Sequence, residues 1–212
     1  MTARLRGWGI KHAHHQPLGV DLELFHPKRR TVTLRERLAL ASDARLVVYA
    51  GRFAPEKNLD ILARAMELLG VPYFALLVGA GRMPRNIPRN MRVLPYMSQR
   101  EDLAALLASC DVFVHPGDQE TFGLAALEAM SCGLPIVGAH AAGLGELVSA
   151  DVGILVEPRS PRALAEGIHE LYQRGTELVG MRARLLAERY AWDPLLARML
   201  GRYAALASRT PA

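Results

Sequence analysis

Apolar residues in the 212-residue chain are grouped into short runs that alternate with segments of helical periodicity. Short apolar runs predict buried strands, and apolar residues three or four positions apart predict amphipathic helices. The predicted strands are residues 45–50, 73–78, 92–96, 111–116, 135–139 and 153–156. The predicted helices are residues 34–40, the segment from about 57 to 70, 100–109, 122–133, 143–149, 161–174, 177–189 and 194–207. This alternation predicts one α/β domain, a Rossmann-like, doubly wound parallel sheet with helices on both faces.

The N-terminal part of the chain carries the excess positive charge. Residues 1–60 hold 11 basic and 6 acidic side chains (11 − 6 = +5), and the remaining residues hold 15 of each. A local excess of this kind does not predict a nucleic-acid-binding face. Residues 1–17 show no convincing periodicity, and His12, His14 and His15 lack the neighbouring acids or cysteines of a metal site. We therefore expect neither an element nor a metal in this segment.

Cysteine use and hydropathy favour a reducing, aqueous setting. Cys110 and Cys132 lie in apolar surroundings without metal-ligand spacing, so we expect buried thiols. No apolar stretch reaches membrane-spanning length, and residues 1–11 lack the apolar core of a signal peptide. The sequence predicts a cytoplasmic protein, with peripheral attachment to the inner face of the membrane as an open alternative.

Two cations follow the first predicted strand, in the sequence GRFAPEKN. Gly51 ends the strand, and Arg52 and Lys57 lie in the loop and helix start that follow it. Ligands of doubly wound sheets bind at the carboxyl ends of the strands, where a guanidinium fork and an ammonium group suit a diphosphate. Pairing of either cation with Glu56 at the surface is the competing interpretation.

A second glycine-containing turn, VGAG at residues 78–81, superficially resembles a dinucleotide-binding fingerprint. Pro84 replaces the third glycine, and no acid lies between Arg82 and Arg100 to hold a ribose. A nicotinamide-dependent dehydrogenase is therefore disfavoured. The arginines of residues 82–100 suit either a basic rim beside phosphates or a solvated loop.

Two acids, Glu120 and Glu128, are separated by seven residues in the stretch PGDQETFGLAALEAMSCG. Thr121 is the expected N-cap of a helix that begins at Phe122 and ends near Gly133. A strand, a tight loop and a helix N-terminus favour anion binding. A carboxylate beside such a site favours a neutral, hydroxyl-rich ligand, and one on an apolar helix needs a partner. Ion pairs with nearby arginines are the competing interpretation.

A fourth loop after a predicted strand, AAGLGE at residues 141–146, is also rich in glycine. Four such loops thus carry glycines, cations or carboxylates. Together they suit a sugar nucleotide, with cations for the diphosphate, backbone amides for phosphate and sugar, and carboxylates for hydroxyl groups.

In order, these motifs resemble the C-terminal half of glycosyltransferase family 4. The matching segments are GVDLELFHP, YAGRFAPEKNLDIL, LLVGAG, DVFVHPGDQETFGLAALEAMSCGLPIV and AAGLGELV, from about Pro17 to the C-terminal helices. Members of this family are retaining, metal-independent enzymes of the two-domain GT-B architecture. The resemblance implies a hexosyltransferase that uses a GDP- or UDP-linked sugar and no cofactor. Similarity to bacterial mannosyltransferase-like members favours GDP-mannose, with a UDP-sugar as the alternative.

The resemblance also implies roles for individual residues. Glu120 would hydrogen-bond hydroxyls of the donor sugar, and Glu128 would bind the nucleotide ribose. Arg52 and Lys57 would hold the donor diphosphate and, with Glu120, are the expected catalytic residues. Further expected donor-site residues are Gly51, the turn residues Thr121, Phe122, Gly123 and Leu124, and the base-pocket residues Met97, Ser98 and Arg100.

The acceptor-binding N-terminal domain of the GT-B fold has no counterpart among these motifs. We expect residues 1–18 to be an interdomain-linker remnant, 19–191 the nucleotide-sugar-binding domain, and 192–212 a C-terminal crossover helix. The expected partners are a nucleotide-sugar donor and the missing domain, in cis or in trans, without nucleic acid. Three hypotheses stay open: half of a glycosyltransferase, a binding module without transfer, and an inactive fragment with an exposed interdomain face.

Overall fold

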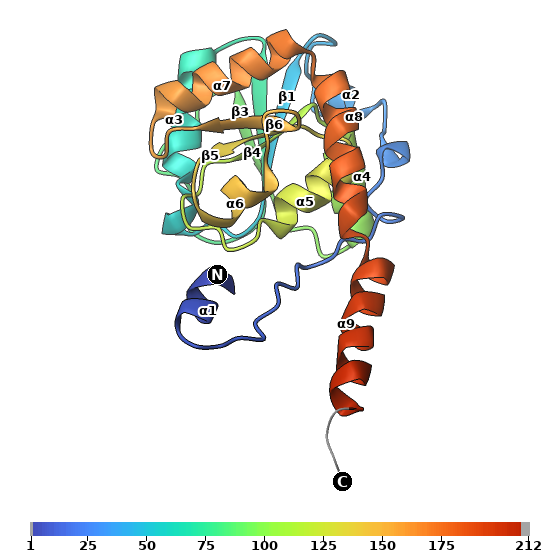
Figure 1. Ribbon diagram of the computed structural model, residues 1–212. Coiled ribbons are helices and arrows are strands. Elements are labelled where there is room, and N and C mark those ends of the chain that lie inside the picture. The colour runs from blue at the N-terminus through green and yellow to red at the C-terminus, as the bar shows by residue number, and fades with distance from the viewer. Residues whose placement is uncertain (1, 209–212) are drawn as a thin grey trace.

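The structure, a computed structural model, describes residues 2–208 and contains a six-stranded parallel sheet (Figure 1). The strands are β1 (Arg45–Ala50), β2 (Tyr73–Val78), β3 (Met91–Leu94), β4 (Val112–His115), β5 (Ile136–Ala139) and β6 (Gly153–Val156). Their order is β3-β2-β1-β4-β5-β6, so the chain winds outward in both directions from the middle of the sheet. The predicted doubly wound fold is confirmed, and its switch point lies between β1 and β4.

Helices cover both faces of this sheet (Figure 1). The helices are α1 (Thr2–Gly7), α2 (Leu34–Arg37), α3 (Leu59–Leu69), α4 (Arg100–Ser109), α5 (Leu124–Ser131), α6 (Ala142–Leu147), α7 (Pro161–Arg174), α8 (Thr176–Ala187) and α9 (Trp192–Ala207). Three short 3₁₀ turns are η1 (Pro27–Arg29), η2 (Pro55–Lys57) and η3 (Glu188–Tyr190). α3 and α7 pack on one face, and α4, α5 and α8 pack on the other.

Alternate residues of β1 enter two different cores. Leu46 and Val48 pack with the helices of the α4–α5–α8 face, whereas Val47 and Tyr49 pack with α3 and α7. Because both faces are covered, the central strands are apolar at successive positions, which made them recognisable in the sequence. The edge strand β3 has only Met91 buried, and it begins one residue before the predicted 92–96 segment.

The N-terminal segment does contain an element, so the expectation of none in residues 1–17 is wrong. α1 (Thr2–Gly7) consists largely of good helix formers, and the Arg4 guanidinium lies 4.9 Å from the Trp8 ring centroid. The helix buries no continuous apolar face, so no periodic pattern marks it in the sequence.

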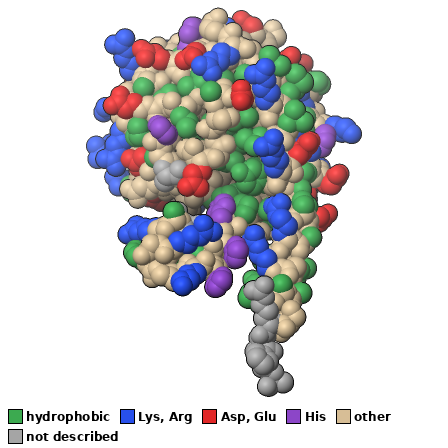
Figure 2. All heavy atoms as spheres, in the orientation of Figure 1, with side chains coloured by type: hydrophobic (Ala, Val, Ile, Leu, Met, Phe, Trp, Pro, Cys, Tyr) green, Lys and Arg blue, Asp and Glu red, His purple; other side chains and the backbone are tan. Residues whose placement is uncertain are grey.

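The C-terminal helix α9 projects away from the sheet and the helices that cover it (Figure 1). Leu195 is buried, but Leu196, Leu200 and Tyr203 are exposed, and Figure 2 shows hydrophobic side chains along the projecting part. Across residues 2–208, no helix has the length and hydropathy to cross a bilayer. The predicted segments 1–18 and 192–212 include Met1 and residues 209–212, which lie outside the described residues.

Candidate donor-binding site

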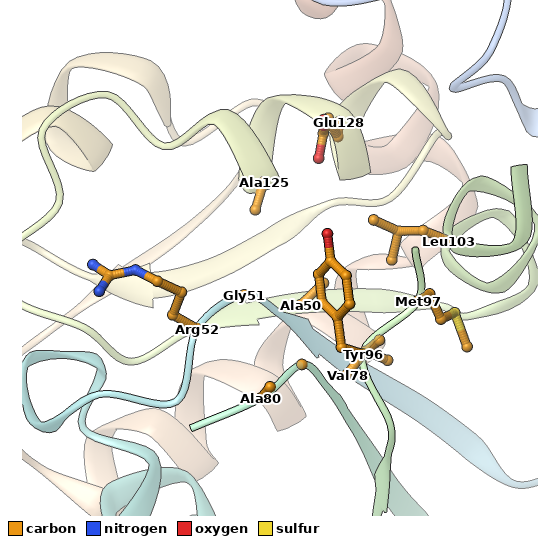
Figure 3. Close-up of a pocket in the computed structure, with 11 residues that line it drawn as sticks. Ala50, Gly51, Arg52, Val78, Ala80, Tyr96, Met97, Leu103, Ala125 and Glu128 are labelled. Atoms are coloured by element: carbon orange, nitrogen blue, oxygen red, sulfur yellow. The ribbon is translucent and has the colours of Figure 1, made fainter. Parts of the chain in front are cut away.

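A cavity of about 400 Å³ opens at the carboxyl ends of β1 and β2, between the segment after β3 and helices α4 and α5 (Figure 3). It is lined by Ala50, Gly51, Arg52, Val78, Gly79, Ala80, Tyr96, Met97, Leu103, Ala125 and Glu128. Most of these residues are apolar or glycine. The cavity therefore suits a flat, weakly charged group such as a nucleobase.

Glu128 and Tyr96 point toward each other across this cavity (Figure 3). Among the described residues, none donates a hydrogen bond to the Glu128 carboxylate or forms an ion pair with it. Burial raises the pKa of the Glu128 carboxyl to about 7, and the charge of Arg100 opposes this only in part. The competing interpretation of Glu128 as an arginine's salt-bridge partner is therefore wrong. A lone carboxylate in an apolar cavity can accept hydrogen bonds from hydroxyl groups of a ligand.

We expect Glu128→Gln to stabilise the protein in mildly alkaline solution. The pKa of this carboxyl is about 7 in the folded chain and 4.5 in its ordinary state. Between these values the folded state holds the extra proton, so stability falls as the pH rises through this window. Above the folded-state pKa, burying the ionised carboxylate lowers the free energy of unfolding by about 2 kcal/mol after allowance for solvent exposure.

Urea unfolding checks this at about pH 8 and about pH 4. The variant should be more stable than the wild type at the higher pH and equally stable at the lower one. Glu67→Gln, at an exposed position of α3, is the matched control and should change stability at neither pH. A gain of the same size at both pH values would show that Glu128 does not titrate as a buried carboxyl.

Lys57, Glu120 and His115 form a second cluster at the switch point between β1 and β4. Lys57 Nζ donates a hydrogen bond to Glu120 Oε2 at 2.7 Å, and both side chains are more than four-fifths buried. Burial by itself raises the pKa of Glu120, but the hydrogen bond and charge of Lys57 outweigh it and hold this pKa below its usual value. Glu120 is therefore ionised at neutral pH.

The competing interpretation of surface pairing with Glu56 is wrong for Lys57 and correct for Arg52. Arg52 Nη2 lies 3.4 Å from Glu56 Oε1, and the arginine side chain is 79% exposed. An exposed pair of this length contributes little stability, so Arg52 can exchange Glu56 for an anionic ligand. Within residues 2–208, no three His, Cys, Asp or Glu side chains come together as a possible metal-ligand group.

The start of α5 differs from the predicted one. Its N-cap is Gly123, with φ of 87°, so the expectation that Thr121 caps a helix beginning at Phe122 is wrong. Glu120 is the reason, because its Oε1 accepts hydrogen bonds from the N–H groups of Thr121 and Gly123 at 3.1 and 3.2 Å. These bonds fold the loop into a left-handed turn that glycine adopts without strain.

The backbone N–H groups of Phe122 and Leu124 at this turn have no acceptor among residues 2–208. The Phe122 ring faces inward and packs edge-on against Tyr190, with the ring centroids 6.1 Å apart. The Gly123 N–H, also expected to serve the ligand, is occupied by Glu120. The first turn of α5 therefore presents free donors beside Glu120, as expected for an anion or sugar site.

The glycine-rich turn of residues 141–146 packs directly on the Glu120 loop. The Gly143 N–H donates to the Glu120 carbonyl oxygen at 2.8 Å. A Cβ at Gly143 would lie only 2.2 Å from the Thr121 carbonyl oxygen, so a larger residue would push the two loops apart. The structure thus brings together two of the glycine-containing loops that the sequence indicated.

Of the three residues expected in a base pocket, Met97 lines the cavity. Ser98 and Arg100 are not among its lining residues in the described part of the chain, and the Arg100 guanidinium lies 5.4 Å from the Phe25 ring centroid. Their roles stay predictions. Sequence reasoning missed Tyr96. The signal that could have indicated it is an aromatic residue at the carboxyl end of the predicted strand 92–96, next to Met97.

Gly51 and Gly79 allow the ends of β1 and β2 to approach closely beside the cavity. A Cβ at Gly79, whose φ is +151°, would lie 1.9 Å from the Gly51 carbonyl oxygen. We expect Gly79→Ala to destabilise the protein by about 1–3 kcal/mol in urea unfolding and to weaken ligand binding, because the backbone must shift. Gly201→Ala, with open space around it, is the control, and equal stabilities of the two variants would contradict this account.

The family model described as "Glycosyl transferases group 1" matches residues 31–186, which is most of the chain. The chain belongs to this family. The resemblance of its motifs to glycosyltransferases is therefore confirmed. A curated relative of this group 1 glycosyl transferase chain is the GDP-mannose-dependent alpha-(1-6)-phosphatidylinositol dimannoside mannosyltransferase of Mycobacterium tuberculosis. It is 37% identical over 202 residues, which cover 92% of this chain and 52% of that protein.

Two solved structures have a similar fold and cover most of this chain. Sucrose-phosphate synthase from Thermosynechococcus elongatus matches with a TM-score of 0.81 and 27% identity, covering 98% of this chain and 56% of that one. HepE of Anabaena, in complex with UDP and glucose, matches with a TM-score of 0.77 and 25% identity, covering 88% and 55%. This group 1 glycosyl transferase chain thus spans about half the length of the relatives it matches.

Proposed function

We propose that this chain is the donor-binding half of a retaining glycosyltransferase that transfers a hexosyl group from a nucleotide sugar. The observation that carries the proposal is the convergence of four ionisable side chains at one edge of the sheet, beside an apolar cavity. They are Arg52, Lys57, Glu120 and Glu128. These residues come from two stretches that are far apart in the sequence, 52–57 and 120–128. A surface ion pair alone gives no reason for a cavity beside them.

The proposed ligand lies along the carboxyl edge of β1, β2 and β4. The base occupies the cavity beside Tyr96 and Met97, and the ribose hydroxyls donate hydrogen bonds to Glu128. The diphosphate lies nearer the switch point, where Arg52 and Lys57 provide the cations. The sugar hydroxyls then reach Glu120, whose position beside the first turn of α5 supports this order.

The chemistry that this arrangement supports is loss of a nucleoside diphosphate from the sugar. Negative charge develops on the departing diphosphate as the glycosidic bond breaks. Fixed cations and free backbone N–H groups in a partly buried site stabilise that charge. Arg52, Lys57 and the α5 N-terminus would supply these interactions, so we propose that the reaction needs no metal ion.

Mannose from GDP-mannose is the proposed donor group, because a 37% identical relative is named as GDP-mannose-dependent. The UDP complex of HepE supports a UDP-sugar as the alternative. Because the relatives are about twice as long, we propose that an acceptor-binding half acts with this chain in cis or in trans. The mycobacterial relative's name includes a phosphatidylinositol acceptor, which supports peripheral association with a membrane.

A transfer assay tests the proposal. The chain is incubated with radiolabelled GDP-mannose or UDP-glucose and bacterial membrane extract, with Glu120→Ala as the paired variant. Label transferred by the wild type and lost in the variant would support catalysis. Binding of the sugar nucleotide without transfer by either protein would favour the alternative, a nucleotide-sugar-binding module. A folded wild type that binds neither sugar nucleotide would contradict both.

A further inference from the structure

His115, the last residue of β4, is an imidazole buried beside the Lys57–Glu120 pair. Its side chain is 4% exposed, and neither ring nitrogen forms a hydrogen bond with any residue of the described chain. The ring stacks on Tyr49, with centroids 6.3 Å apart and planes at 29°. Tyr49 in turn donates a hydrogen bond from its hydroxyl to the Arg52 carbonyl oxygen at 2.8 Å. A buried polar side chain without a partner is costly, so this one calls for an explanation.

The geometry around Glu120 explains why the His115 ring is left without a hydrogen bond in the described chain. His115 Nε2 lies 3.3 Å from Glu120 Oε2, although not in hydrogen-bonding geometry. That oxygen accepts its hydrogen bond from Lys57 Nζ, whereas Oε1 is held by the N–H groups of the α5 turn. In the free chain, therefore, the imidazole lies beside an oxygen that Lys57 already occupies.

The proposed function requires Lys57 and Glu120 to serve different parts of the donor, and this inference rests on that function. When Lys57 turns to the diphosphate, Glu120 Oε2 loses its cation inside a mostly buried site. We propose that His115 is a positioning residue whose Nε2–H then donates to Glu120 Oε2 and holds the carboxylate against the sugar hydroxyls. Only a small rotation of either side chain is needed, because the two atoms are already 3.3 Å apart.

A neutral imidazole suits this exchange better than a second cation. Burial and the charge of Lys57 lower the pKa of His115 to about 4, and Glu120 opposes this only in part. At neutral pH the ring carries one N–H, which can replace the Lys57 hydrogen bond without competing for the diphosphate. In the free state, Lys57 donates the hydrogen bond to Glu120 Oε2. In the proposed donor-bound state, His115 donates it instead.

The tautomer of His115 is a direct readout of this exchange. The wild-type chain, with ¹⁵N-labelled histidine, is observed by NMR before and after saturation with whichever of GDP-mannose and UDP-glucose it binds. The His115 signal is assigned by its loss in His115→Gln. We expect a neutral ring in both states, with the proton on Nε2 in the bound state and a shift of that nitrogen on binding. A bound ring with its proton on Nδ1, or an unchanged His115 signal at saturation, would overturn the proposal.

Two variants separate positioning from mere packing. His115→Leu should weaken binding of the sugar nucleotide about tenfold. Binding of the nucleoside diphosphate should weaken by a smaller factor, because this ligand also draws Lys57 away from Glu120 but has no sugar for Glu120 to hold. His115→Gln, whose amide nitrogen can reach the place of Nε2, should keep both affinities within about threefold of wild type. Equal losses for both ligands, or equal losses in both variants, would overturn the positioning role. A wild type that binds the nucleoside diphosphate normally leaves the proposed donor site intact even if His115 fails this test.

Discussion

Replacing Arg52 or Lys57 with alanine is expected to weaken nucleoside diphosphate binding about ten- to a hundredfold, with nucleoside binding unchanged within about twofold. Each cation is proposed to make charge-assisted hydrogen bonds to the diphosphate, and a nucleoside lacks that group. Lys57→Ala should have the larger effect, because Lys57 is mostly buried and Arg52 is 79% exposed. Titration calorimetry with GDP and guanosine, or UDP and uridine, measures both affinities.

The matched control for these two variants is Arg64→Ala. Arg64 is exposed on α3, away from the carboxyl ends of the strands, so its removal lowers the net charge without touching the proposed site. Its diphosphate affinity should equal that of the wild type. Nucleoside and diphosphate affinities that fall together in the Arg52 and Lys57 variants would contradict the diphosphate role of the two cations.

Asp111→Ala is expected to cost about 3–5 kcal/mol of the free energy of unfolding. Both carboxylate oxygens accept hydrogen bonds from Arg35 Nη2, at 2.9 and 2.8 Å, and the Asp111 side chain is 15% exposed. The same carboxylate accepts from the Leu46 N–H at 2.7 Å and from the Tyr172 hydroxyl at 3.3 Å. It thus joins α2, β1 and α7 at the amino end of the sheet, and its loss leaves a partly buried arginine unpaired.

Urea unfolding of the variant measures this cost. Asp43→Ala removes an exposed acid at the same end of the sheet and should change stability by less than about 0.5 kcal/mol. Asp111→Asn, which keeps one oxygen acceptor, should lie between the wild type and the alanine variant. If the Asp111 and Asp43 variants unfold at the same urea concentration, the Asp111 contacts do not stabilise the fold.

The sheet could be predicted from the sequence because its central strands are buried on both faces. β1, β2 and β6 have the predicted bounds, since a short apolar run between polar turns leaves few alternatives. The start of α5 could not be predicted in the same way. Thr121 has the chemistry of an N-cap, but Glu120 takes the N–H groups of that turn, and Gly123 caps the helix instead.

The residue types in the sequence indicated most members of the candidate site, but they did not indicate which residues contact one another. Lys57 lies next in sequence to Glu56, yet it bonds to Glu120, 63 positions away, because the fold brings η2 beside the loop after β4. The unpartnered His115 depends on that same long-range pair. Tyr96 follows a short edge strand with little burial, so its place in the cavity depends on α4 and α5 rather than on its own segment.

The central claim is that this chain binds the nucleotide part of a sugar donor at the carboxyl edge of its sheet. Titration calorimetry of the wild-type chain with GDP and with UDP tests it most directly, with circular dichroism to show that the sample is folded. The account predicts saturable binding of at least one of them, with competition by the corresponding sugar nucleotide and loss of that binding in Lys57→Ala. A folded chain that binds neither diphosphate would contradict it.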